Sequence, residues 1–367
     1  MTKKREYSLD VLKIVTTLVV LLIHYQQVFQ GIPGLHYPFY AGSRTFFLFA
    51  VELFFVLSGF LMYRYEKRIR EGMSFPRFFL RRYLRFLPLM AMSVTVYAAL
   101  SWGLFYDHFR TTGELRGLYL LEEPSVWGWL VTALGLQAGW GPADPHINAP
   151  LWYISALLGC CLVFYGIVRV SRRLKISPCY FYAGMILLGI SLNGHPYDHL
   201  PFLTASMARG YYSFFAGLLL AKVLEKRPVS LRTAGVCAGI VLVFFTAFRF
   251  SWTRALMEPN YMMLAGIVVL PALVTLFLSA PIRRLFAHPW LGTLGAIAFD
   301  VYIWHDTGNV LAAILGEAFS WNAFFYSVPG MVIWIALTWA FGAFSYFCIE
   351  KPIDRRVQAW MEKQPWA

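Results

Sequence analysis

The first apolar run of the chain reads Asp10-Val-Leu-Lys13-Ile-Val-Thr-Thr-Leu-Val-Val-Leu-Leu-Ile-His24 and continues to residue 30. A helix of this length is long enough to cross the hydrocarbon core of a bilayer. His24 lies deep inside the run, where an ionised side chain costs roughly 3 kcal/mol on the insertion scale. Because ionisable residues at such depth usually mark a functional site, His24 is the first candidate in the chain.

Similar runs recur along all 367 residues, of which 59% are hydrophobic and only 14% are charged. This composition predicts an all-α, polytopic membrane protein with about ten transmembrane helices in one bundle. The short loops between runs leave no room for a separate globular module, so we expect a single membrane-embedded domain over residues 1–367. The expected spans are residues 9–30, 45–64, 84–105, 149–170, 178–193, 204–224, 232–250, 259–280, 292–315 and 323–348.

The net charge of +13 reflects membrane topology rather than nucleic-acid binding, because the basic residues fall between apolar runs and form no patch with interleaved aromatics. With ten spans and both termini in the cytoplasm, six arginines face outward, and all the others of the 32 Lys and Arg residues lie at the cytoplasmic side. This asymmetry satisfies the positive-inside rule. The outer six are Arg44, Arg110, Arg116, Arg209, Arg249 and Arg254.

The longest outer loop is expected between residues 106 and 148. Its segment 126–138 is apolar but short for a span, and counting it as one would scatter Lys and Arg to both sides of the membrane. We therefore expect a re-entrant or interfacial piece. The five cysteines lie in or at the ends of apolar runs, without a CxxC motif or a His at ligand spacing, so neither a disulfide framework nor a metal site is expected.

Glu52, in the second expected span, is the first candidate partner of His24. The two residues lie at nearly equal depth, seven and six residues from the outer ends of their spans. A carboxylate beside an imidazole orients the ring and fixes its tautomer, which is the usual arrangement of a general base. The alternative is a structural hydrogen bond between helices, but a structural role rarely needs two costly groups. Lys13 lies on the same face as His24, about 16 Å nearer the cytoplasm.

His305 marks a second polar cluster, near the middle of the ninth expected span. Asn309 follows one turn later on the same face. This pattern fits three roles equally: lining a cavity, hydrogen-bonding a neighbouring helix, or taking part in a reaction.

Arg82 and Arg85 lie in the cytoplasmic stretch between the second and third spans. At i and i+3 they share one helical face, where their guanidinium groups can grip a phosphate. A basic stripe that touches anionic lipid headgroups explains the same pattern.

An aromatic and hydroxyl cluster opens the fourth expected span, with Trp152, Tyr153 and Ser155. The two aromatic residues fit an interfacial aromatic belt. Ser155 offers a hydroxyl that can hydrogen-bond a sugar, so the three are candidates for the substrate cavity.

Taken together, these stretches resemble the acyltransferase-3 family of integral-membrane proteins, bacterial enzymes that move acyl groups onto extracytoplasmic glycans and related acceptors. Each motif is weak alone, but six in the order of the family make a specific pattern that covers nearly the whole chain. The motifs are Lys13 with His24, the Glu52-Leu-Phe-Phe-Val-Leu-Ser-Gly-Phe60 block, Arg82-x-x-Arg85, Pro150-Leu-Trp-Tyr-Ile-Ser155, Tyr302-Ile-Trp-His305 and Ile349-Glu350-Lys351-Pro352.

The resemblance implies a multi-pass protein of the bacterial cytoplasmic (inner) membrane. Its co-substrate would be acyl-CoA, with acetyl-CoA expected, its acceptor a carbohydrate or glycolipid, and no cofactor would be permanently bound. His24 would be the catalytic histidine, supported by Glu52, and His305 would line the central cavity. Arg82 and Arg85 would grip the CoA phosphates, and Lys13 would be either a polar support or a donor-site residue.

The chain departs from the family pattern twice. Lys13 stands where the family usually has an arginine, which keeps the charge but loses the planar fork. Leu157 stands where many members carry a glutamate, so no role of that glutamate transfers to this chain.

Two readings from other classes remain open. A proton-coupled transporter or flippase of envelope saccharides would also use buried ionisable groups, although no inverted repeat or matching pair of broken helices supports it. A catalytically inactive relative that scaffolds an envelope assembly is the third. Within the enzyme reading, His24 is either a general base or the carrier of the acyl group.

Overall fold

The computed structural model describes residues 5–29, 32–33, 49–105, 125–140, 147–198, 200–226, 228–247 and 260–364, and every regular element in these ranges is a helix. Four helical stretches in them are long and apolar enough to cross a membrane: Tyr7–Val28, Phe75–Trp102, Ala149–Leu174 and Val328–Met361. The all-α prediction is therefore confirmed, whereas the number of ten spans stays a prediction. Most of the outer loop expected between 106 and 148 lies outside the described residues, as do all the outer arginines except Arg209.

Residue contacts group the chain into two compact units that interleave along the sequence. The first comprises Met1–Thr16, Leu48–Phe75 and Gly159–Gly295, and the second Thr17–Phe47, Pro76–Leu158 and Ala296–Ala367. Three long helices contribute to both units: α1 (Tyr7–Val28), α7 (Trp152–Leu174) and α15 (Pro289–Ala318). The first unit also contains α2 (Ala50–Met62), α3 (Arg64–Arg70), α8 (Pro178–Gly194), α9 (Ala205–Lys226), α10 (Leu231–Ala247), α12 (Tyr261–Leu264), the π-helical turn η4 (Ala265–Val269), α13 (Leu270–Phe277) and α14 (Ala280–Leu285). The second contains α4 (Phe75–Ala99), η2 (Leu100–Phe105), α6 (Val126–Ala133), η3 (Ala149–Leu151), α16 (Asn322–Phe325), α17 (Val328–Ser345), η5 (Tyr346–Glu350) and α18 (Lys351–Met361).

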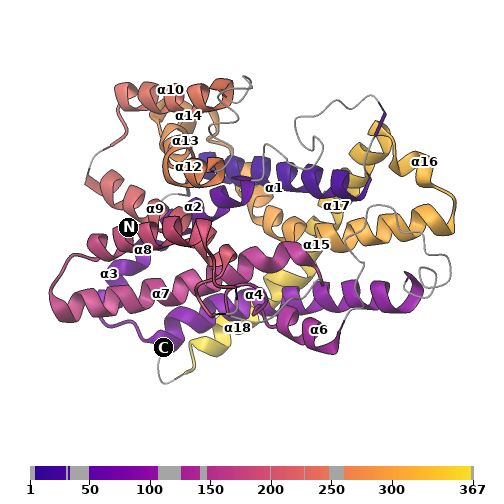
Figure 1. Cartoon of the computed structure of the whole chain (residues 1–367), viewed down its shortest axis with the longest axis horizontal. Helices are drawn as coiled ribbons and strands as arrows, with labels where there is room; N and C mark the ends of the chain where they lie inside the picture. The colour runs from indigo at the N-terminus through magenta and orange to yellow at the C-terminus, as the bar shows by residue number, and fades with distance from the viewer. Residues whose placement is uncertain are drawn as a thin grey trace. The chain divides into compact units, whose positions relative to one another are not determined.

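Helix α9 is central to the first unit, where it packs against α2 and α8 (Figure 1). Glycines bring the backbones of α2 and α9 into direct contact: a Cβ added at Gly59 would lie 1.9 Å from the Phe214 carbonyl oxygen, and one at Gly217 would lie 2.1 Å from that of Val56. Small residues at a helix crossing allow this approach, which membrane helices need because apolar side chains gain little by leaving lipid for protein. Arg209 bonds to Glu52, and further along both segments the Tyr63 hydroxyl donates to Glu225, so α2 and α9 run parallel.

In the second unit, hydrogen bonds hold α4 and the start of η3 against α15. Ser93 of α4 donates its hydroxyl to the Ile303 carbonyl at 3.0 Å and lies 3.0 Å from the Thr307 hydroxyl. The Asn148 side chain donates to Ser93 at 3.0 Å, and the Tyr302 hydroxyl donates to the Pro150 carbonyl at 2.5 Å. These bonds hold the part of α15 around His305 against its neighbours.

The segment predicted as a re-entrant or interfacial piece forms α6, which has 8 residues and is too short to cross a bilayer. The Ser125 hydroxyl caps its first turn by accepting from the Gly128 backbone N–H at 2.8 Å. Val126 and Trp127 are mostly exposed, while Val131 is buried. This segment therefore packs one face on the protein and presents an apolar face outward.

Candidate active site

His24 and His305 come together in the second unit, with their ring centroids 5.0 Å apart and their planes inclined by 52°. Seven residues earlier on each helix, the Thr17 hydroxyl donates to the Ala298 carbonyl at 3.4 Å. Because both helices advance by seven residues, two turns, between these contacts, α1 and α15 run parallel there. The two histidines meet because they occupy equivalent positions of adjacent parallel helices.

The protonation of His305 follows from its hydrogen bond. Its Nδ1 lies 2.5 Å from the Tyr302 carbonyl oxygen, which can only accept, so Nδ1 carries the proton. The neutral ring then has its lone pair on Nε2, which is buried and has no hydrogen-bond partner among the described residues. The ring of Tyr302 packs 5.5 Å from that of His305. This is the tautomer a proton acceptor needs.

Asn309 lies one turn beyond His305 and is also buried. Its Nδ2 amide nitrogen has no hydrogen-bond partner in the described part of the chain. The sequence analysis placed Asn309 on the face of His305, and α15 is continuous over both residues. One face of this helix therefore carries an unused acceptor and an unused donor.

Arg82 and Arg85 lie near the start of α4. The Arg82 guanidinium stacks over the Phe78 ring at 4.0 Å from its centroid and donates to the Phe78 carbonyl at 2.5 Å. Arg85 donates from Nε to Glu350 at 3.0 Å and keeps about half of its side chain exposed, 47%. Their role in gripping CoA phosphates stays a prediction, and the structure adds the carboxylate that holds Arg85.

Glu350 belongs to a buried polar chain that leads from Arg85 toward the middle of α15. Its carboxyl group lies beside that of Asp300, and Asp300 Oδ1 accepts from the Ser345 hydroxyl at 2.7 Å. Ser345 in turn accepts from the Trp304 indole N–H at 3.0 Å.

Glu52 lies in the first unit, where it is completely buried. Arg209 of α9 donates to both of its carboxylate oxygens, at 2.5 Å from Nε and 2.9 Å from Nη2. The Tyr212 hydroxyl adds a third bond at 3.3 Å. Since His24 belongs to the second unit, the predicted support of His24 by Glu52 stays a prediction, and the partner that the structure gives Glu52 is Arg209.

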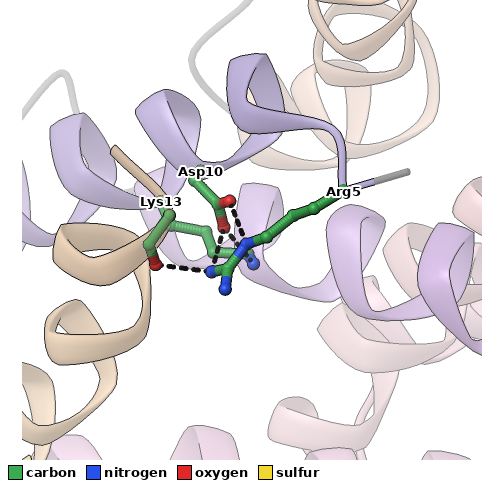
Figure 2. Close-up of polar contacts among 4 residues, drawn as sticks. Arg5, Asp10 and Lys13 are labelled. Carbon is green, nitrogen blue, oxygen red and sulfur yellow. Dashed lines mark hydrogen bonds and ion pairs between the residues drawn. The ribbon is translucent and has the colours of Figure 1, made fainter. Parts of the chain in front are cut away.

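Lys13 also lies in the first unit, 2.9 Å from Asp10 (Figure 2). Arg5 donates to the same carboxylate at 2.7 Å and to the Gly292 carbonyl at 2.6 Å. Gly295 allows α15 to approach, since a Cβ there would lie 2.6 Å from that of Asp10. Asp10 thus joins the N-terminal segment to the start of α15, and the donor-site role of Lys13 stays a prediction.

The three cavity candidates on α7 occupy different surroundings within the second unit. Tyr153 is buried, and its ring forms an edge-to-face pair with that of Tyr302, 5.8 Å between centroids, while Trp152 is half-buried. The Ser155 hydroxyl accepts from the backbone N–H groups of Ala138 and Gly139, at 3.0 and 3.1 Å. Ser155 thus fixes the turn that follows α6, and the substrate contacts of all three remain predictions.

A family model described as an acyltransferase domain, that of the acyltransferase-3 family, matches residues 6–349. The chain belongs to this family. It is 25% identical over 325 residues to BcsY of Komagataeibacter xylinus, which is named as a membrane-bound transacylase; the alignment covers 85% of this chain and 78% of that protein. No solved structure shows significant similarity to the chain. The protein is thus a membrane acyltransferase, as its motifs suggested.

Sequence reasoning missed three residues that the structure places beside the candidates: Arg209, Asp300 and Glu350. A signal existed for each. Arg209 lies five residues into its expected span, at about the depth of Glu52, and Glu350 belongs to a family motif. Asp300 lies inside an expected span, where a carboxylate needs a partner.

Proposed function

We propose that the protein transfers an acyl group, acetyl by expectation, from cytoplasmic acyl-CoA to a hydroxyl of an extracytoplasmic glycan or related acceptor. The observation that carries the proposal is the pairing of His24 with His305, in the same unit as Arg82 and Arg85. Arg82 and Arg85 bind the CoA phosphates, and the histidine pair receives the thioester. Trp152, Tyr153 and Ser155 contribute to the cavity of the acceptor.

The spacing between Arg85 and the histidine pair is compatible with the length of a CoA molecule. Arg85 precedes Ser93 on α4 by eight residues, about 12 Å of helix, and Ser93 is bonded to α15 two residues to either side of His305. Along α15, Asp300 precedes His305 by five residues, about 7.5 Å. The phosphates of CoA are separated from its sulfur by the flexible pantetheine arm. Such a donor can therefore hold its phosphates at Arg85 while its thioester reaches the histidines.

The proposed topology has ten spans in a single catalytic domain of the bacterial inner membrane, with both termini in the cytoplasm. Helix directions support this count. In an alternating chain, parallel neighbours must differ by an even number of spans. This holds for α1 and α15, the first and ninth spans, and for α2 and α9, the second and sixth. Counting α6 as a span would make α1 and α15 antiparallel.

The experiment is CoA release from acetyl-CoA by the purified protein in detergent, measured with a thiol reagent. The wild-type protein should release CoA, and His24→Ala should lower the rate by about 10²- to 10⁴-fold while the protein remains folded. Unchanged release in that variant would remove His24 from the mechanism. No release by the wild-type protein would favour the rival transporter or flippase, which has no need of a thioester.

A further inference from the structure

The face of α15 next to His24 carries two buried polar atoms that the described residues leave without partners: His305 Nε2 and Asn309 Nδ2. Both side chains are more than nine-tenths buried. A buried polar group without a hydrogen bond destabilises the folded protein. In the same stretch of α15, the hydroxyls of Tyr302 and Thr307 and the indole N–H of Trp304 are bonded. The two open positions thus lie where a ligand can use them.

The two atoms are chemically complementary. His305 Nε2 holds a lone pair, because the ring proton is on Nδ1 and bonded to the Tyr302 carbonyl. Asn309 Nδ2 is a donor only. At i and i+4 on one helical face, their Cβ atoms lie about 6 Å apart. A hydroxyl group can donate a hydrogen bond to His305 Nε2, and a carbonyl oxygen can accept one from Asn309 Nδ2. Acyl transfer to an alcohol brings a hydroxyl group and a carbonyl group together.

We propose that His305 is the base that accepts the proton of the acceptor hydroxyl, and that Asn309 donates a hydrogen bond to the acyl carbonyl oxygen. His24, whose ring lies beside that of His305, then carries the acyl group. This inference rests on the proposed function. It assigns His24 the role of acyl carrier, one of the two roles that the sequence left open, the other being general base.

The reaction takes two steps. In the first, a ring nitrogen of His24 attacks the thioester carbonyl carbon; the C–N bond forms, the C–S bond breaks, and the ring proton of His24 ends on the CoA thiol. In the second, the hydroxyl oxygen attacks the same carbon and its proton passes to His305 Nε2. The C–O bond forms, the C–N bond breaks, and His305 returns the proton to His24. In both steps Asn309 stabilises the negative charge that develops on the carbonyl oxygen.

The test uses radiolabelled acetyl-CoA and purified protein in dodecyl maltoside, so that water and the maltoside hydroxyls are the acceptors. His305→Asn keeps an N–H that can reach the Tyr302 carbonyl but removes the base. We expect this variant to release about one CoA per chain and to retain the label, while steady turnover falls by about 10²- to 10⁴-fold. In His24→Ala the label should be absent.

Imidazole added to His305→Ala should restore part of the turnover, which a purely structural role does not predict. Undiminished turnover in His305→Asn, or loss of the label in a variant that is still folded, would overturn the inference. Absence of CoA release by the wild-type protein would instead contradict the proposed function as a whole.

Asn309→Leu tests the second half of the proposal. Loss of the donor should lower turnover by about 10²- to 10³-fold with little change in the KM for acetyl-CoA. Thr307→Val is the matched control, since Thr307 lies between the two residues but bonds to Ser93 of α4. Thr307→Val should lower thermal stability and leave turnover per folded molecule near that of the wild-type protein. Equal turnover in Asn309→Leu and Thr307→Val would contradict the role of Asn309.

Discussion

Replacing Arg209 by Met should destabilise the protein strongly, although Arg209 belongs to no motif of the family pattern. Glu52 has no exposed surface, and Arg209 supplies two of the three hydrogen bonds to its carboxylate. Among the described residues, the variant leaves the buried carboxylate bonded to Tyr212 alone. Breaking a buried ion pair from one side costs about 3–5 kcal/mol. At about 1.4 kcal/mol per factor of ten, the unfolded population rises by roughly two to three and a half powers of ten.

The decisive comparison is the double variant Glu52→Leu with Arg209→Met, which removes both charges. Its stability should return to within about 1 kcal/mol of the wild type, because an apolar pair of similar volume often replaces a buried ion pair without loss. Unfolding is followed by titration with SDS in mixed micelles. Lys67→Met is the control: its partner Glu71 is exposed, so the cost should be about 1 kcal/mol or less.

Two results would refute this reasoning: a loss below about 1 kcal/mol in Arg209→Met, or a double variant as unstable as the single one. The same double variant tests the predicted link between Glu52 and His24. If Glu52 serves only α2 and α9, CoA release should recover together with stability. If Glu52 supports His24, the stable double variant should remain inactive.

Three further results are expected. Gly59→Ala should destabilise by about 3 kcal/mol, the upper end of the usual cost of overpacking, since backbone atoms of α9 must move. Gly184→Ala, with open space at its Cβ, should change stability little. Similar melting of the two variants in detergent would contradict the close packing of α2 on α9. Glu350→Gln should raise the KM for acetyl-CoA more than it lowers kcat, because Arg85 loses its ion pair with Glu350. An unchanged KM would argue against Arg85 as a phosphate ligand. Ser155→Ala should cost about 1–3 kcal/mol, as two backbone N–H groups lose their acceptor; a thermal midpoint equal to that of the wild type would show that these bonds contribute little.

The fold class and the family could be read from the sequence, because both rest on properties of single segments. Apolar runs predict helices, and motifs in a fixed order identify a family whatever the contacts between them. His24 and His305 were each recognised in the same way, as ionisable residues inside apolar runs. Their contact could not be predicted, since it depends on the direction and register of two helices that are far apart in sequence.

The partner of Glu52 shows the limit of arguments from depth in the membrane. Depth in the membrane restricts a residue to a layer, and both His24 and Arg209 lie in the layer of Glu52 in the predicted topology. Only the packing of α2 on α9, set by Gly59 and Gly217, selects Arg209. In the same way, Ser155 was noticed for its hydroxyl, but the sequence contains no sign that a distant turn uses it.

The parallel pairing of α1 with α15 also bears on how the protein is made. At about 5–20 residues per second, the ribosome needs roughly 15 to 60 seconds to advance from His24 to His305. During that time α1 is already synthesised, whereas its neighbour in the final structure does not yet exist. Chains that stop before α15 contain the first histidine without the second. Incomplete products should therefore be inactive toward acyl-CoA, and the cell gains a catalyst only from chains that are nearly finished.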